Sequence, residues 1–128
     1  MEIDWKIIDS HEQKFENSCI PSAVEMVLKL LKKVDSSYYD QQSQWEKIGS
    51  FAYYDGRTIE GVTFKLRNKL TVDELFAEID RELKENKCVI ISLKSILIDP
   101  RQPPNKCHMY VIYDYNEKKK DYKAFTKN

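Results

Sequence analysis

The apolar segment from Cys19 to Leu31 constrains the fold of this chain more than any other part of the sequence. Hydrophobic residues recur in it at the i, i+3, i+4 and i+7 positions of an α-helix: Ile20, Ala23, Val24, Val27, Leu28 and Leu31. Met26 and Leu30 widen this stripe, so the helix is expected to be buried on most of its sides. Ser18 can cap its first turn, and Pro21 falls where a missing N–H does no harm.

The segments on either side of this helix have weaker patterns. Trp5 to Ile8 is short, apolar and rich in β-branched residues, which predicts a strand or an extended segment. Asp9 to Ser18 is polar and has no helical period, so a loop is expected there. Asp35 to Asn68 is the least readable part, and it predicts only a short helix over Gln41 to Ile48.

The second half of the chain predicts one more helix and a small sheet. Thr71 and Glu74 form a capping box ahead of apolar residues at helical spacing, so an amphipathic helix is expected to end near Asn86. The next apolar run predicts a buried strand. Two later segments, separated by a lysine-rich turn, predict an antiparallel hairpin. The strand and the two arms of the hairpin are expected over Cys88–Leu93, Cys107–Tyr115 and Asp121–Thr126.

These elements predict a single α+β domain over residues 1–128, with N-terminal helices packed on a C-terminal antiparallel sheet. The 21 basic residues balance 21 acidic ones, whereas nucleic-acid binding would be expected to leave a basic excess. No apolar run has the length of a signal peptide or a membrane span. The three cysteines lack the spacing of a disulfide framework or a zinc site. We therefore expect a cytoplasmic protein that needs no metal or cofactor and binds no nucleic acid.

Three cysteines and two histidines give six possible thiol–imidazole pairs, and sequence context removes most of them. Cys88 lies in an apolar run and is expected to fill the core. Cys107 precedes His108 on one predicted strand, so their side chains should point to opposite faces. His11 lies in the polar loop and is expected to be solvated. Cys19 with His108 remains as the candidate pair.

Cys19 begins the predicted helix, where unpaired N–H groups stabilise a thiolate. Gln13 precedes it by six positions and can bring a side-chain amide to an oxyanion formed at the same helix end. Each residue also has a plain structural interpretation, as a buried thiol and as a solvated loop glutamine. Their combination favours a thiol nucleophile with His108 as its base.

A third group should orient the imidazole of His108. If the hairpin turns near Lys118, the residue opposite His108 is Asn128, an amide acceptor of the right kind. A shift of one residue in the register would switch the face, so other candidates stay open. They are Thr126, Asp121 and Asp114.

Together these residues resemble the papain-like cysteine peptidases, in particular the bacteriocin-processing (double-glycine) branch and its stand-alone peptidase-like relatives. The spacing of Gln13 and Cys19 matches the oxyanion glutamine and nucleophile of the family. Cys19-Ile20-Pro21-Ser22-Ala23 resembles the Cys-Gly-Pro-Ala-Ala-like helix start of that branch, and the His108 strand resembles its base strand. The resemblance implies a papain-like fold and a cysteine peptidase or other thiol hydrolase that acts on a peptide or protein substrate.

Two residues depart from the family pattern. Ile20 replaces the glycine that usually follows the nucleophile, which narrows the approach of a substrate backbone. The Asp or Asn that usually follows the histidine strand has no exact counterpart before Asn128. Two alternatives to hydrolysis remain. One is acyl transfer to an amine, and the other is a non-catalytic binding module that recognises a peptide or partner through the aromatic segment Tyr38 to Tyr54.

Overall fold

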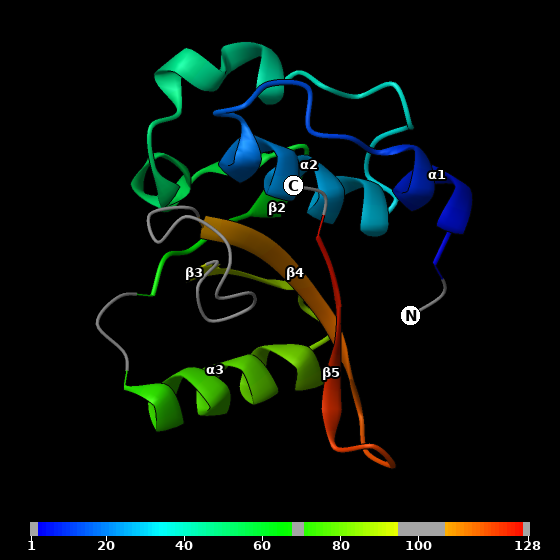
Figure 1. The fold of residues 1–128 in the computed structure, drawn as a ribbon, viewed down its shortest axis with the longest axis vertical. Helices are drawn as coiled ribbons and strands as arrows, with labels where there is room; N and C mark the ends of the chain where they lie inside the picture. Colours follow the sequence, from blue (N-terminus) through cyan, green and yellow to red (C-terminus); the bar gives the residue numbers. More distant parts are fainter. Residues whose placement is uncertain (1–2, 68–70, 95–106, 127–128) are drawn as a thin grey trace.

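The computed structural model describes the backbone of residues 3–67, 71–94 and 107–126. These residues form an α+β arrangement in which helices pack on antiparallel strands. Figure 1 shows α2 (Cys19–Leu30) on one side of a three-stranded sheet and α3 (Val72–Lys84) on the other. The sheet has the order β3-β4-β5, and its strands span Val89–Lys94, Cys107–Asn116 and Asp121–Phe125. The helix expected to end near Asn86, the strand expected after it and the C-terminal hairpin are confirmed.

α2 lies at the centre of the packing, as its apolar pattern predicts. The ten residues Pro21–Leu30 are all buried. Two hydrophobic clusters share this helix. The first joins it to α1 and β4 and contains Ile8, Ala23, Met26, Val27, Leu30, Met109 and Val111. The second joins it to the middle of the chain and contains Val24, Leu28, Ile48 and Tyr54. Because other elements cover α2 on most sides, tertiary packing fixes its position.

The first apolar segment is helical, so the strand expected there is wrong. α1 spans Trp5–Ser10. Asp4 caps it, because its side chain accepts hydrogen bonds from the backbone N–H groups of Lys6 at 3.1 Å and Ile7 at 3.4 Å. Ile8 is buried in the first cluster. A capping aspartate and one buried contact therefore outweigh the β-branched composition of this segment.

The middle of the chain contains two 3-10 helices and a small hairpin. The first 3-10 helix confirms the short helix expected in this region. The hairpin was not expected from the sequence. Glu60 and Gly61 connect its strands with positive φ values of 49° and 82°, which suits a two-residue turn of type I′. The elements are η1 (Gln42–Lys47), η2 (Phe51–Tyr54), β1 (Thr58–Ile59) and β2 (Val62–Thr63).

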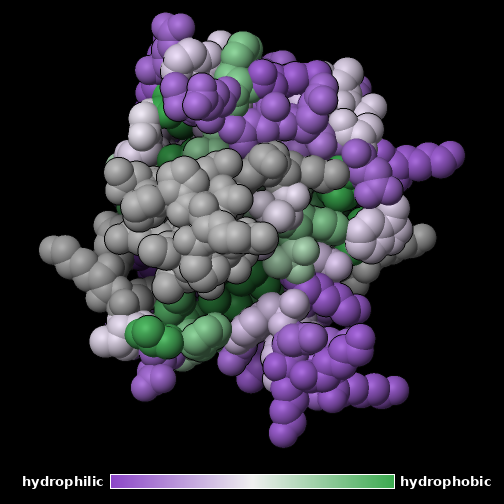
Figure 2. All heavy atoms as spheres, viewed as in Figure 1, coloured by the Kyte–Doolittle hydropathy of each residue, from purple (hydrophilic) through white to green (hydrophobic). Residues whose placement is uncertain are grey.

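The surface is hydrophilic at both ends of the view in Figure 2, with hydrophobic residues nearer the centre of that face. The lower end holds the turn between β4 and β5, where Lys118–Lys120 are exposed, as expected for the tip of a hairpin. Among the described residues, no helix combines the length and apolarity needed to cross a bilayer.

Candidate functional site

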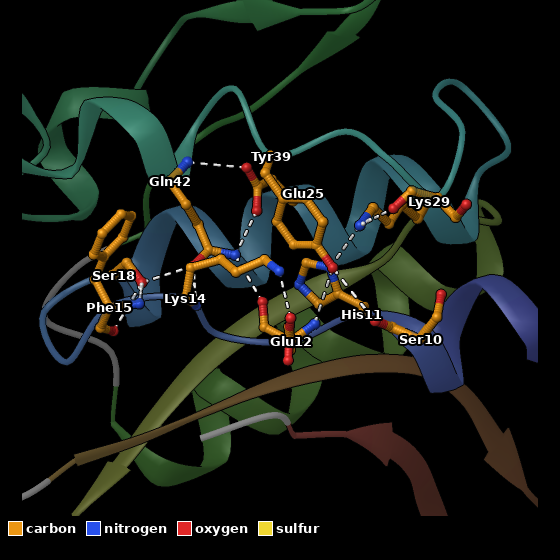
Figure 3. A network of polar contacts seen from close by, with 11 residues as sticks. Ser10, His11, Glu12, Lys14, Phe15, Ser18, Glu25, Lys29, Tyr39 and Gln42 are labelled. Carbon is orange, nitrogen blue, oxygen red and sulfur yellow. Dashed lines mark hydrogen bonds and ion pairs between the residues drawn. The ribbon is translucent and has the colours of Figure 1, made fainter.

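Cys19 is the first residue of α2 and is half-buried. It packs against the first hydrophobic cluster, to which β4 contributes Met109 and Val111. The helix that carries the candidate nucleophile therefore lies along the strand that begins with Cys107 and His108. Figures 1 and 3 both show the starts of α2 and β4 at the same end of the molecule.

His108 is placed through its backbone, which pairs with Leu93 of β3. Its side chain is outside what the structure describes, and so is all of Asn128. The last described pair of β4 and β5 on this side is Val111 with Phe125. The expectation that Asn128 lies opposite His108 assumes this same register. The contact between Cys19 and His108 remains a prediction.

The carboxylates proposed as alternative partners of His108 lie far along the hairpin. Asp114 is six residues from His108 on β4, or about 20 Å at the usual rise of a strand. Asp121 pairs with Asn116 beside the turn, farther still. Thr126 follows the last described pair and is exposed. The observed register therefore removes the two aspartates as partners of His108.

Gln13 is half-buried in the loop before α2, and its amide holds the loop together. The Nε2 group donates to the carbonyl oxygens of Phe15 at 2.8 Å and Glu16 at 3.1 Å. Its Oε1 atom is buried and has no hydrogen-bond partner among the described residues. Both N–H donors are thus engaged within the loop, so Gln13 can bind an oxyanion only by releasing one of these carbonyls.

Ser18 does not cap α2 through its side chain, contrary to expectation. Its hydroxyl is buried and lies 2.9 Å from the Phe15 carbonyl oxygen and 2.7 Å from Gln42 Oε1, either of which can accept its proton. The hydroxyl also accepts from the Phe15 N–H at 3.1 Å. Because Ser18 turns away from the helix, it leaves the first-turn N–H groups beside Cys19 without that cap.

His11 is buried, so the expectation that it is solvated is wrong. It is 2% exposed, and its ring stacks on Tyr39 with centroids 5.6 Å apart. Nε2 lies 2.9 Å from the carbonyl oxygen of Ser22, and Nδ1 lies 2.9 Å from Lys29 Nζ. When Lys29 is protonated it donates to Nδ1, and this pairing requires the tautomer of His11 whose Nε2–H donates to the Ser22 carbonyl oxygen. The polar sequence of the loop gives no sign of this, because Ser22 and Lys29 belong to α2 and Tyr39 follows that helix in the chain.

Glu25 and Lys29 are charged residues inside the buried helix, and both are almost fully enclosed. Burial raises the pKa of the Glu25 carboxyl, while hydrogen bonds from Gln42 and the Lys29 charge oppose this shift. Burial lowers the pKa of Lys29, against the charge of Glu25. Lys29 also donates to the Ser36 carbonyl oxygen at 3.2 Å and lies over the Tyr39 ring at 3.9 Å. Two charges within an otherwise apolar helix are the sequence signal that polar partners must cover α2.

The substitution Glu25→Gln should show the cost of this buried carboxylate as a pH dependence. The folded-state pKa is raised above its ordinary value of 4.5, so the stability contributed by Glu25 is fully present below that value. It is lost as pH rises through the folded-state pKa, by up to about 1.4 kcal/mol per pH unit. The stability of the unmodified protein relative to Glu25→Gln should therefore fall as pH rises from about 4, as measured by urea unfolding.

Glu85→Gln provides a control of opposite sign for this measurement. Glu85 is exposed, and its hydrogen bond with Lys87 lowers the pKa of the Glu85 carboxyl. The stability of the unmodified protein relative to Glu85→Gln should therefore rise slightly with pH instead of falling. A pH-independent difference for Glu25→Gln would contradict the predicted effect of burial.

Of the other two cysteines, Cys88 is the one whose side chain the structure describes. Cys88 is half-buried against the first cluster, and burial raises the pKa of its thiol to about 11. The structural role expected for Cys88 agrees with this position. Cys107 begins β4, and its side chain is outside the described residues.

The aromatic residues of the middle segment are largely core or half-buried. Tyr54 is 3% exposed and belongs to the second cluster. Tyr39 is stacked on His11, and the Tyr38 hydroxyl accepts a hydrogen bond from Gln41 Nε2 at 3.0 Å. Most of these rings therefore support the fold and do not form an open recognition surface.

No family model, curated protein or solved structure matches this chain. Within the described ranges, no group of three or more His, Cys, Asp or Glu side chains is placed to hold a metal ion.

Proposed function

We propose that this chain is a cysteine peptidase or related thiol hydrolase of papain-like arrangement, with Cys19 as nucleophile and His108 as base. One observation carries the proposal. The helix that begins at Cys19 packs along the strand that begins at Cys107 and His108, and Cys19 contacts the cluster that includes Met109. A thiol at a helix N-terminus with a histidine on the adjacent strand is the pair that nucleophilic acyl chemistry needs.

In the proposed reaction, His108 takes the proton of the Cys19 thiol, and the thiolate attacks the carbonyl carbon of a peptide or other acyl substrate. A C–S bond forms, and the carbonyl oxygen becomes an oxyanion near the start of α2. The Cys19 backbone N–H and one N–H of Gln13 would donate to it. His108 returns its proton to the leaving amine as the C–N bond breaks. Water then hydrolyses the thioester and regenerates the thiol.

The position of Ser18 supports the proposed oxyanion site. Because its hydroxyl binds the loop and Gln42, it leaves the first-turn donors of α2 to a ligand. Asn128 would orient the imidazole of His108 from the end of the hairpin. Gln13 would exchange one loop carbonyl for the oxyanion, so its contribution is expected to appear only when an acyl group is bound.

Two other functions use the same residues differently. Acyl transfer would replace water by an amine, and its products would appear when the acylated protein is incubated with candidate amines. A non-catalytic binding module would use a hollow of about 760 Å³ that borders α2, η2, α3 and β3 and is partly lined by Phe51 and Tyr54. We favour a catalytic function over the binding module because the aromatic rings of the middle segment are largely committed to packing.

Alkylation by iodoacetamide tests the thiol–imidazole pair without a known substrate. An ordinary thiol is almost entirely protonated at about pH 6, whereas a thiol paired with an imidazole at a helix N-terminus keeps a large thiolate fraction. Replacing His108 by alanine should therefore slow alkylation of the Cys19 peptide at about pH 6 by roughly tenfold or more. The rate is followed by mass spectrometry of that peptide. Tyr115→Ala, farther along β4 and exposed, is the matched control. An unchanged pH profile in His108→Ala would overturn the pair.

A further inference from the structure

We infer that Gln42 is a positioning residue for the proposed thiol site, although it lies on η1 and 23 residues after Cys19 in the chain. The inference rests on the proposed function and extends it to a residue that the sequence pattern did not single out. Figure 3 shows the Gln42 side chain between α2 and the loop of residues 11–18 that carries Gln13.

The side-chain amide of Gln42 makes four hydrogen bonds, which use its full donor and acceptor capacity. Nε2 donates to the Glu12 carbonyl oxygen at 2.9 Å and to Glu25 Oε1 at 2.7 Å. Oε1 accepts from the Lys14 backbone N–H at 2.6 Å and lies 2.7 Å from the Ser18 hydroxyl. Glu12 and Lys14 are the two neighbours of Gln13. One amide therefore fixes the backbone on both sides of Gln13 and the residue that precedes Cys19.

The amide has only one satisfactory orientation. Gln42 is 0% exposed, and the Glu25 carboxylate accepts from both its side-chain Nε2 and its backbone N–H, the latter at 2.9 Å. Reversing the amide would set its oxygen against the carboxylate and its nitrogen against the Lys14 N–H. Such unpaired buried groups cost about 1–3 kcal/mol each. Glu25 on α2 thus orients Gln42, and Gln42 orients the loop.

The consequence for catalysis is specific. The thiol of Cys19 is set by α2, which the two hydrophobic clusters hold in place. Gln13, by contrast, is held through the loop. Loss of the Gln42 amide should therefore displace the oxyanion donor while leaving the thiolate and its imidazole in place.

Two reagents separate these effects in the full chain. Acetylation by p-nitrophenyl acetate passes through a tetrahedral oxyanion, after which the C–O bond breaks and nitrophenolate leaves. Alkylation by iodoacetamide displaces iodide and forms no oxyanion. In Gln42→Met, the burst of nitrophenolate should slow by about tenfold to a hundredfold, since loss of an oxyanion donor costs up to about 10²–10³ in rate. Alkylation of Cys19 should keep its rate and its pH profile.

Gln41→Met is the matched control. Gln41 is the adjacent buried glutamine, and its amide bonds Tyr38 and Tyr54 at 3.0 Å each instead of the loop. The Gln41→Met variant should unfold at a lower urea concentration but keep the rates of acetylation and of alkylation. If Gln42→Met does not fold, Gln42→Glu keeps the size of the side chain. Its deficit in acetylation should shrink as pH falls, because the protonated carboxyl group of Q42E can donate to Glu25 again.

The possible failures are distinguishable. A normal burst in Gln42→Met, or an equal loss of both rates in Gln42→Met and Gln41→Met, would overturn the positioning role and leave the proposed function standing. Absence of any burst and of Cys19 acetylation in the unmodified protein would remove the proposed function and this inference together.

Discussion

Replacing Cys19 by serine is expected to lower the burst rate with p-nitrophenyl acetate by about 10³-fold or more, because removal of a nucleophile costs most of the catalysis in such sites. The substitution changes one atom at a half-buried position at the start of α2, so the fold should be unaffected. Stopped-flow absorbance of released nitrophenolate measures the effect.

Cys88→Ser makes the same change at another half-buried thiol, one whose raised pKa of about 11 keeps it protonated. This variant should retain the full burst. A burst that survives in Cys19→Ser and disappears in Cys88→Ser would contradict the assignment of the nucleophile.

The second large effect concerns stability. Leu28→Ala should lower the free energy of unfolding by about 2–5 kcal/mol, the range for truncating a fully buried leucine. Leu28 is 0% exposed at the centre of the second cluster, among Val24, Ile48 and Tyr54. Urea unfolding followed by tryptophan fluorescence measures the change.

Val72→Ala is the comparison for this substitution. Val72 begins α3 and is 69% exposed, so its truncation should change the free energy of unfolding by no more than about 0.5 kcal/mol. Equal losses in the two variants would contradict the central position of α2.

The elements with a strong local pattern could be predicted from the sequence. The apolar spacing of 19–31 gave the buried helix, and the capping box of Thr71 and Glu74 gave α3, where both bonds of the box are present. The hairpin followed from its alternating segments and lysine-rich turn. In each case the residues that specify the element lie within it, so a short window of sequence contains the information.

The errors at His11, Ser18 and Gln42 share one physical reason, whereas α1 differs from expectation through its local Asp4 cap. His11 was expected in solvent, Ser18 was expected to cap α2, and Gln42 was not considered, yet all three are buried through partners far along the chain. Their environment depends on how the loop folds over α2, which no local period encodes. The charges of Glu25 and Lys29 within an apolar helix are a sequence signal that was not used, and they indicate a need for polar partners without identifying them.

The candidate site also combines residues that are close in sequence with one that is distant. Gln13 and Cys19 are close in sequence; Cys19 begins α2, and the Gln13 amide is engaged by carbonyls of the loop before it. His108 belongs to the other half of the chain, and the packing of α2 along β4 is what supports pairing it with Cys19.

Peptide mapping of the full chain after brief treatment with p-nitrophenyl acetate tests the central claim most directly. We predict one acetyl group per chain, attached to Cys19 as a thioester that hydroxylamine removes. Acetylation confined to lysines, or an acetyl thioester on Cys88 or Cys107 instead, would contradict the claim that Cys19 is the nucleophile.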